Sequence, residues 1–295
     1  MSDQTPRILV LGAHPDDADI KAGGTSALWR DAGFAVKFVS LTDGRMGHHI
    51  MTGPALVERR RAEAKAAGAV LGIDYELLDI PDSELDDRIE YRHRLIRLIR
   101  AFRPDVLVTH RPIDYHPDHR FAGQLVQDAA YLLTVPGVCA DVKHMDRVPV
   151  ILFFQDGFTK PCPFRPDVVV DVYPAIDRIV AMLDHHVSQF YEWLPFNAGH
   201  ASEVPEAPDD RREWLGRQFR ERIGPLAHHY RDHVNATYGV EVGHAVTYVE
   251  AFEVSEQGAS LDHAARRRTF PFLPAPEEEA TTHRKWWVDQ PGKAR

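Results

Sequence analysis

Short apolar runs alternate with longer helix-like stretches along the first half of the chain. Four of these runs are bounded by turn residues and are typical of buried strands; they cover residues 8–11, 35–41, 75–80 and 105–109. The stretches between them are alanine-rich or carry apolar residues at helical spacing, and they cover residues 20–32, 57–69 and 89–102. Strands and helices in this alternation predict βαβ units and an α/β fold, with a Rossmann-like, mostly parallel sheet flanked by helices.

The second half of the chain continues the pattern less regularly. Strands are predicted at 148–154 and 168–171, with an additional C-terminal strand at 245–254; helices are predicted at 121–133, 176–190 and 214–222. Residues 194–210 are rich in Pro, Glu and Ala, which favours an exposed loop or lid. We therefore expect one domain over residues 1–254 and a C-terminal extension over 255–295. Trp286 and Trp287 in that extension favour either a tail or an arm that packs on a neighbour, such as a second copy in a homo-oligomer.

Composition narrows the classes of protein to consider. The chain has 295 residues and a net charge of -9, which argues against a general nucleic-acid binder, because phosphate binding needs a basic face. No apolar run approaches the roughly 20 residues of a membrane span, and the start of the chain lacks the apolar region of a signal peptide. The two cysteines, Cys139 and Cys162, make no disulfide framework. We expect a cytoplasmic protein without a membrane span.

Ionisable side chains gather directly after two of the predicted strands. His14, Asp16 and Asp17 follow the first strand, and a dense cluster from His110 to His119 follows the strand at 105–109. Ligands bind at the carboxyl ends of strands in open α/β sheets, and a Rossmann-like strand order would place these two strands side by side. Three of the side chains, His14, Asp17 and His119, would then lie within reach of one atom. The sequence predicts one composite site.

The residue types in the two clusters favour a metal-dependent hydrolase. A catalytic zinc ion takes three His, Asp or Glu ligands and keeps a position for water. His14 and Asp17 are three residues apart, as are His116 and His119, so each pair can point inward from the start of a helix. The surplus groups can serve as a carboxylate base and as an imidazole that faces a developing oxyanion. Taken singly, each residue is more often structural, for example as a helix cap. Two His-Pro-Asp elements after two strands make that explanation unattractive.

Several short motifs together resemble those of the LmbE-like, or PIG-L, metal-dependent N-deacetylases. The matches are A-H-P-D-D at Ala13–Asp17, L-T-D-G at Leu41–Gly44, R-x-x-E at Arg60–Glu63 and H-P-D-H at His116–His119, with weaker echoes in H-x-S-Q at His186–Gln189 and E-x-F at Glu250–Phe252. The correspondence spans about residues 7–254. The resemblance implies a Rossmann-like fold and removal of an N-acetyl group from a small-molecule conjugate of N-acetylglucosamine.

The resemblance also implies roles for individual residues. Zinc would be held by His14, Asp17 and His119, and Fe²⁺, Mn²⁺ or Co²⁺ could replace it, because such ligands choose weakly between metals. Asp16 would be the general base. His116, oriented by Asp118, would stabilise the oxyanion and protonate the leaving amine. The substrate contacts implied in the same way are Arg60, Asp82, Tyr115 and His186.

Three other interpretations stay open. The protein could be a metal-dependent amidase that acts on a non-sugar amide, since only the substrate pocket separates the two. It could be a non-catalytic sugar- or nucleotide-binding module, although Asp16 is a spare carboxylate for which a binding site has little use. A structural metal is the third, but structural zinc sites usually close with four Cys or His ligands, and both cysteines lie far from the clusters in sequence.

Overall fold

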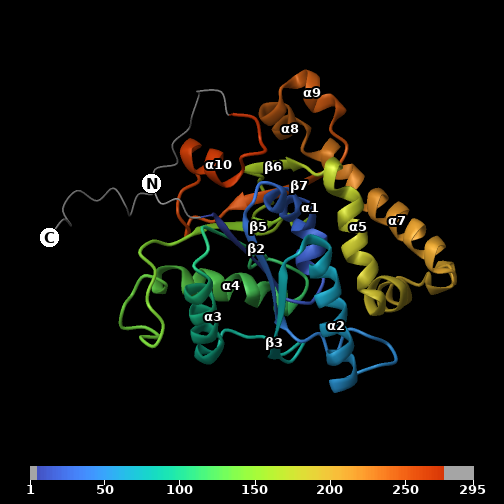
Figure 1. Cartoon of the computed structure of the whole chain (residues 1–295), viewed down its shortest axis with the longest axis horizontal. Coiled ribbons are helices and arrows are strands. Elements are labelled where there is room, and N and C mark those ends of the chain that lie inside the picture. Colours follow the sequence, from blue (N-terminus) through green and yellow to red (C-terminus); the bar gives the residue numbers. More distant parts are fainter. Residues whose placement is uncertain (1–4, 276–295) are drawn as a thin grey trace.

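A seven-stranded sheet forms the centre of the computed structural model, which describes residues 5–275 (Figure 1). The strands follow the order β3-β2-β1-β4-β5-β7-β6. Their bounds are Arg7–Gly12 for β1, Ala35–Thr42 for β2, Asp74–Ile80 for β3, Val106–Thr109 for β4, Val150–Phe154 for β5, Val168–Asp171 for β6 and Val249–Val254 for β7. Strands β1 to β5 are parallel to one another, and β1 pairs with both β2 and β4. This arrangement confirms the predicted α/β class and the adjacency of the first and fourth strands.

The last strand in sequence is inserted antiparallel into the far side of the sheet. β7 pairs with β5 through Phe154 and Phe252 and with β6 through Val168 and the same Phe252. The predicted strand at 245–254 therefore exists but begins at Val249, because the preceding residues form the helix α9 (Val240–Ala245). The alternating sequence pattern predicted a strand here, but it did not predict which strands would be its neighbours in the sheet.

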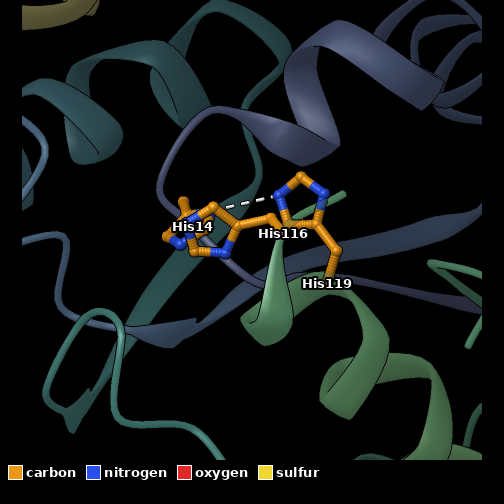
Figure 2. Close-up of side chains that lie close together, drawn as sticks. All are labelled: His14, His116 and His119. Carbon is orange, nitrogen blue, oxygen red and sulfur yellow. Dashed lines mark hydrogen bonds between the residues drawn. The ribbon is translucent and has the colours of Figure 1, made fainter. Parts of the chain in front are cut away.

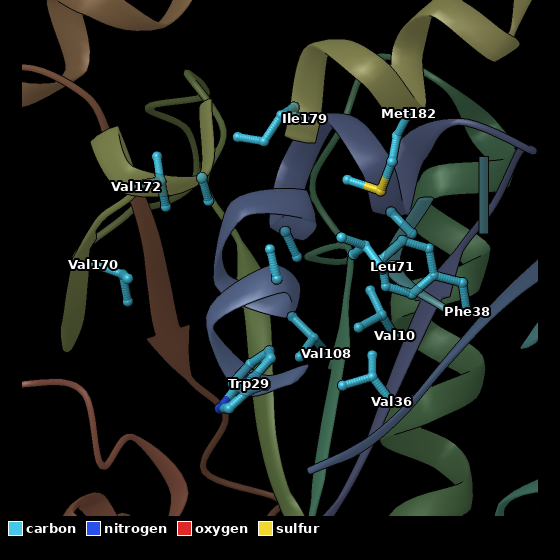
Figure 3. Packing of buried hydrophobic residues seen from close by; sticks show 14 of the residues in the cluster. Val10, Trp29, Val36, Phe38, Leu71, Val108, Val170, Val172, Ile179 and Met182 are labelled. Atoms are coloured by element: carbon cyan, nitrogen blue, oxygen red, sulfur yellow. The ribbon is translucent and has the colours of Figure 1, made fainter. Parts of the chain in front are cut away.

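Helices cover both faces of the sheet. Alternate residues of β1 point to opposite sides, so that Ile8 and Val10 join one core while Leu9 and Leu11 join the other. The first core lies under α1 (Asp17–Asp31), α2 (Pro54–Leu71), α5 (Ile176–His185) and α7 (Pro208–His229). The second core lies under α3 (Ile89–Phe102) and α4 (Pro117–Leu132). Figure 3 shows part of the first core, to which α5 contributes Ile179 and Met182 and the sheet contributes Val10 and Val108.

The segment after α5 differs from its prediction. The long helix expected over 176–190 ends at His185 and is followed by a π-helix, Ser188–Trp193. Residues 194–210 are largely helical rather than an open loop, since they contain α6 (Leu194–Asn197), a short turn of 3₁₀-helix and the start of α7. Pro195 and Pro208 are compatible with these helices, because each lies in a first helical turn, where proline is favoured. Sequence composition could not separate this use of proline from a loop.

The described part of the C-terminal extension packs on the same core. It contains α10 (His263–Thr269), and the ring of Phe270 lies 5.3 Å from that of Trp29. The Trp29 indole N–H donates a hydrogen bond to the Thr269 carbonyl at 2.6 Å. Trp286 and Trp287 lie outside the described residues, so the predicted arm stays a prediction, as does the domain boundary at 254. Among the described residues, none of the helices combines the length and the apolar character that a membrane crossing needs.

A buried carboxylate ties the inserted strand to the helix that follows β1. Glu250 of β7 accepts hydrogen bonds from the backbone N–H groups of Gly24 and Thr25 in α1, each at 2.8 Å. We expect Glu250→Ala to lower the free energy of unfolding by about 1–3 kcal/mol, because it leaves these buried donors unpaired. Urea unfolding would measure the change, with Glu256→Ala on the exposed turn after β7 as the control. Equal unfolding midpoints for both variants would contradict this role.

Candidate functional site

The predicted site residues meet where β1 and β4 end. His14 lies just past β1, and α1 begins at Asp17. His116 is the N-cap residue of α4, whose first residue, Pro117, is suited to that position. His119 follows in the first turn of the same helix. Figure 2 shows the rings of His14, His116 and His119 gathered at one point, with a dashed line for the 3.2 Å contact between His14 Nδ1 and His119 Nε2.

Three donor groups lie at distances that suit one metal ion. His14 Nδ1 is 3.2 Å from His119 Nε2, and the Asp17 carboxylate lies 3.6 Å from the former and 3.5 Å from the latter. Ligands of a tetrahedral zinc ion with bonds of about 2.0–2.1 Å are about 3.3 Å apart. Each of the three contacts is close to this spacing, with Asp17 Oδ2 toward His14 and Asp17 Oδ1 toward His119. Single donor atoms within 4.8 Å of one another form three groupings in the described residues: His14 with His116 and His119, Asp17 with His110 and His119, and His14 with Asp82, His116 and Asp118.

The outer nitrogen of each of these two histidines faces a carboxylate. His14 Nε2 lies 3.2 Å from Asp118 Oδ2 and 3.4 Å from Asp82 Oδ1. His119 Nδ1 lies 3.1 Å from Asp114 Oδ1. Histidines that bind metals almost always donate their second ring N–H to such a partner, which fixes the tautomer and leaves the other nitrogen free for the ion. The arrangement fits a divalent metal ion between His14, His119 and Asp17.

His110 supports Asp17 and was not among the predicted site residues. Asp17 Oδ2 accepts the His14 backbone N–H at 2.7 Å and lies 3.1 Å from His110 Nε2, which leaves Oδ1 toward His119. The His110 ring stacks on His119 with centroids 4.1 Å apart. Burial lowers the pKa of His110 to about 4, so the ring is neutral at pH 7. The sequence signal that could have identified His110 is its position directly after β4, at the carboxyl end of a strand.

We expect His110→Ala to weaken metal binding by about 10–100-fold, the usual effect of removing a partner that orients a ligand. Competition with a chromophoric chelator would measure the affinity. His110→Gln is the matched variant, because its amide can place an N–H near the position of Nε2 and should recover part of the loss. Wild-type affinity in the alanine variant would show that Asp17 is oriented without His110.

Asp16 and Arg60 form a buried pair beside this centre. Arg60 Nη2 donates to Asp16 Oδ2 at 3.1 Å and to the Pro15 carbonyl at 2.8 Å. Burial raises the pKa of the Asp16 carboxyl, and the Arg60 charge opposes that rise. The Arg60 side chain is only 2% exposed. It packs closely on Gly44, where a Cβ atom would lie 2.6 Å from Arg60 Nη1. Arg60 was predicted to contact substrate; in this position it holds Asp16 instead.

His116 and its neighbours take a form that differs partly from the prediction. His116 Nδ1 accepts a hydrogen bond from the backbone N–H of Asp118 at 3.2 Å, so the ring proton belongs on Nε2. The Asp118 carboxylate turns elsewhere, accepting the Ser83 N–H at 2.7 Å and contacting His14. Asp118 therefore orients His116 through its backbone rather than its side chain. Tyr115 is 73% exposed, with its ring 5.6 Å from that of His119.

The other two predicted substrate contacts are buried. The His186 side chain is fully buried, with Nε2 3.3 Å from Asp19 Oδ2, so it has no surface to offer a substrate and lies in a supporting layer. Asp82 is 4% exposed and faces His14. Burial favours its neutral form, but the hydrogen bond and charge of His14, the Arg60 charge and the Met46 backbone N–H together outweigh burial and lower the pKa of Asp82 to about 2. Asp82 thus belongs to the charged lining of the centre.

The H-x-S-Q motif at His186–Gln189 has a structural role that the sequence did not reveal. Glu63 accepts hydrogen bonds from the Ser188 backbone N–H at 2.9 Å and from its hydroxyl at 2.6 Å. Gln189 donates to the Gly47 carbonyl at 2.9 Å. The π-helix therefore joins α2 to the loop after β2. Glu63, from the R-x-x-E motif, lies more than a hundred residues before the H-x-S-Q motif, so only the folded chain shows that the two motifs are in contact.

The sequence and the fold are both similar to those of known proteins. Residues 9–130 match the family model described as PIG-L, GlcNAc-PI de-N-acetylase. The chain is 30% identical to diacetylchitobiose deacetylase of Thermococcus kodakarensis, over 64% of this chain and 74% of the relative. It is also 30% identical to 4-oxalmesaconate hydratase of Pseudomonas putida, over 63% and 74%. Its fold resembles N,N'-diacetylchitobiose deacetylase from Pyrococcus horikoshii, with a TM-score of 0.65, 24% identity and coverage of 86% of this chain and 85% of that one. The chain belongs to the PIG-L, or LmbE-like, family of enzymes.

Proposed function

We propose that this enzyme is a zinc-dependent N-deacetylase that acts on a small-molecule conjugate of N-acetylglucosamine. The observation that carries the proposal is the placement of a buried carboxylate, Asp16, beside three donors at metal-ligand spacing, His14, Asp17 and His119. The name of one relative, diacetylchitobiose deacetylase, and that of the matching family model, GlcNAc-PI de-N-acetylase, support an N-acetyl amide bond on an amino sugar as the target. Zinc is proposed because its preferred ligands include imidazole and carboxylate.

A metal ion bound there would polarise the acetyl carbonyl and lower the pKa of a water molecule toward neutrality. Asp16 would act as the base that takes a proton from the attacking water as a new C–O bond forms, and the Arg60 guanidinium keeps the carboxylate in place. His116 carries its proton on Nε2 and donates a hydrogen bond to the developing oxyanion. The C–N bond then breaks, and the amine nitrogen receives a proton.

The source of that last proton follows from the surroundings of His116. Burial, followed by the charges of His14 and His119, lowers the pKa of His116, so the ring starts the reaction neutral. Negative charge on the substrate oxyanion beside the ring favours its protonated form as the reaction proceeds. The ring can then take up the proton that Asp16 removed from the water and pass it to the leaving amine, which leaves His116 neutral and Asp16 ionised again. Tyr115 lies exposed next to it and is placed to contact the substrate.

The first experiment is metal analysis of the purified protein together with acetate release from N-acetylglucosamine and its conjugates, with and without a chelator. The proposal expects one metal ion per chain and acetate release that the chelator abolishes and zinc restores. Bound metal without acetate release from any conjugate would refute the sugar-amide substrate. Acetate release that a chelator leaves unchanged after complete metal removal would refute the metal dependence.

A second candidate is hydration of a carbon–carbon double bond, which the similarity to the Pseudomonas putida hydratase favours. A carboxylate base beside a metal centre could activate water for addition to an unsaturated acid as well as to an amide. The two functions are separated by assaying loss of ultraviolet absorbance from a conjugated unsaturated keto acid alongside acetate release. Hydration without deacetylation would replace the first proposal by the second.

A further inference from the structure

Exposed apolar side chains occur on segments that border the site. Nine large apolar side chains of the described residues are exposed; two of them lie in the loop after β2, one directly precedes His116, and one stacks on His49 of that loop. These four are Met46, Ile50, Tyr115 and Phe196, which are 51%, 81%, 73% and 50% exposed. Exposed apolar patches on a soluble protein commonly mark sites of binding. Their concentration here calls for an explanation that the reaction at the metal does not supply.

Three stacked rings build the larger part of this surface. His49 lies between His48, with centroids 4.7 Å apart and planes at 18°, and Phe196, at 4.0 Å and 9°. The stack is anchored from below, because His48 Nε2 lies 2.8 Å from Glu192 Oε2, and Arg59 holds the same carboxylate through two hydrogen bonds. His48 itself is buried, so its anchoring fixes the ring on which His49 rests. A preformed aromatic surface of this kind loses little conformational entropy when it binds a ligand.

The stack is continuous with the catalytic cluster. The backbone N–H of Met46 donates to Asp82 Oδ2 at 3.3 Å, and the other Asp82 oxygen faces His14. A Cβ at Gly47 would lie 3.7 Å from Asp82 Oδ2, so the loop passes directly beside the charged centre. Tyr115 stands next to His116 and His119, which approach the centre from α4. The apolar side chains thus border the centre both along the β2–α2 loop and at the start of α4.

We propose that Met46, His49, Ile50, Phe196 and Tyr115 form a subsite for an apolar aglycone, an aryl or alkyl group attached to the N-acetylated sugar. The inference rests on the proposed function and adds the substrate class to it. An aryl group can stack on the exposed part of Phe196 or Tyr115, and an alkyl chain can lie along Met46 and Ile50. The same side chains offer a polyhydroxylated aglycone few hydrogen-bonding partners, which places such conjugates at a disadvantage.

The test compares binding of the phenyl and methyl glycosides of glucosamine, the expected products, to the metal-loaded enzyme by calorimetry. Because products are used, the result does not depend on turnover, and failure of the deacetylase assay remains a separate outcome. We expect the phenyl glycoside to bind about tenfold more tightly, which corresponds to burial of one face of the ring. Equal affinities, or no binding of either glycoside, would overturn the inference.

Two variants locate the effect. Phe196→Ala should remove most of the preference for the phenyl over the methyl glycoside, while Tyr131→Ala should preserve it. Tyr131 is a matched control, since it is 75% exposed and lies about 18 Å along α4 from His119. A preference that survives Phe196→Ala would place the apolar contact elsewhere and overturn the assignment. So would a change of oligomeric mass in Phe196→Ala with the preference intact, because the patch would then be a contact between copies of the chain.

Discussion

Replacement of Asp16 by asparagine is expected to lower kcat/KM for deacetylation by about 10²–10⁴-fold, the range in which a positioned general base contributes. The substitution preserves the shape of the side chain and an oxygen that can accept the hydrogen bond from Arg60. It removes the ability to take a proton. Metal content should stay at the wild-type level, because His14, Asp17 and His119 are unchanged. Turnover and metal content therefore separate in this variant.

Both quantities can be measured on one preparation, by acetate release and by metal analysis. Asp141→Asn is a suitable control, since it changes an exposed carboxylate that pairs with Arg97 on the surface. Loss of the metal in Asp16→Asn would show that Asp16 is a ligand and that the division of roles between Asp16 and Asp17 is incorrect. Near-normal turnover with full metal would assign the base to another group.

The parallel half of the fold could be predicted from the sequence because each strand and helix there leaves a local signal. Buried parallel strands read as short apolar runs, and the helix over Ile89–Phe102 was predicted with its observed bounds. Adjacent strands then bring their loops together, so two separate His-Asp clusters become one site. The position of β7 between β5 and β6 has no such local signal, because it depends on packing between residues far apart in sequence.

The supporting residues of the site were harder to predict for a related reason. A motif identifies an arginine or a histidine but not the direction in which its side chain points. Arg60 was expected at the substrate, yet it is buried against Pro15 and Asp16. His186 was expected there too, yet it is fully buried beside Asp19. Both outcomes depend on how α2 and the segment after α5 pack on the start of α1, which no local pattern describes.

Removal of a proposed metal ligand should have a different signature from removal of the base. We expect His119→Ala to weaken metal binding by more than about 100-fold, the upper end of the effect seen for outer partners of ligands. Its Nε2 supplies one of the three donors, and the 3.2 Å contact with His14 Nδ1 disappears with it. Deacetylation should be lost in parallel with the metal. Excess metal should restore part of it, because His14 and Asp17 remain.

His14→Ala should behave in the same way, and His228→Ala, on the exposed side of α7, should match the wild type in both measurements. Urea unfolding of each metal-free protein would show whether a variant fails to bind metal or fails to fold. If His119→Ala keeps its metal at wild-type affinity, His119 is not a ligand, and the neighbouring grouping of His14 with Asp82, His116 and Asp118 becomes the better description of the centre. If both histidine variants keep the metal, the ion lies outside this cluster and the proposed mechanism fails, because Asp16 would then have no activated water beside it.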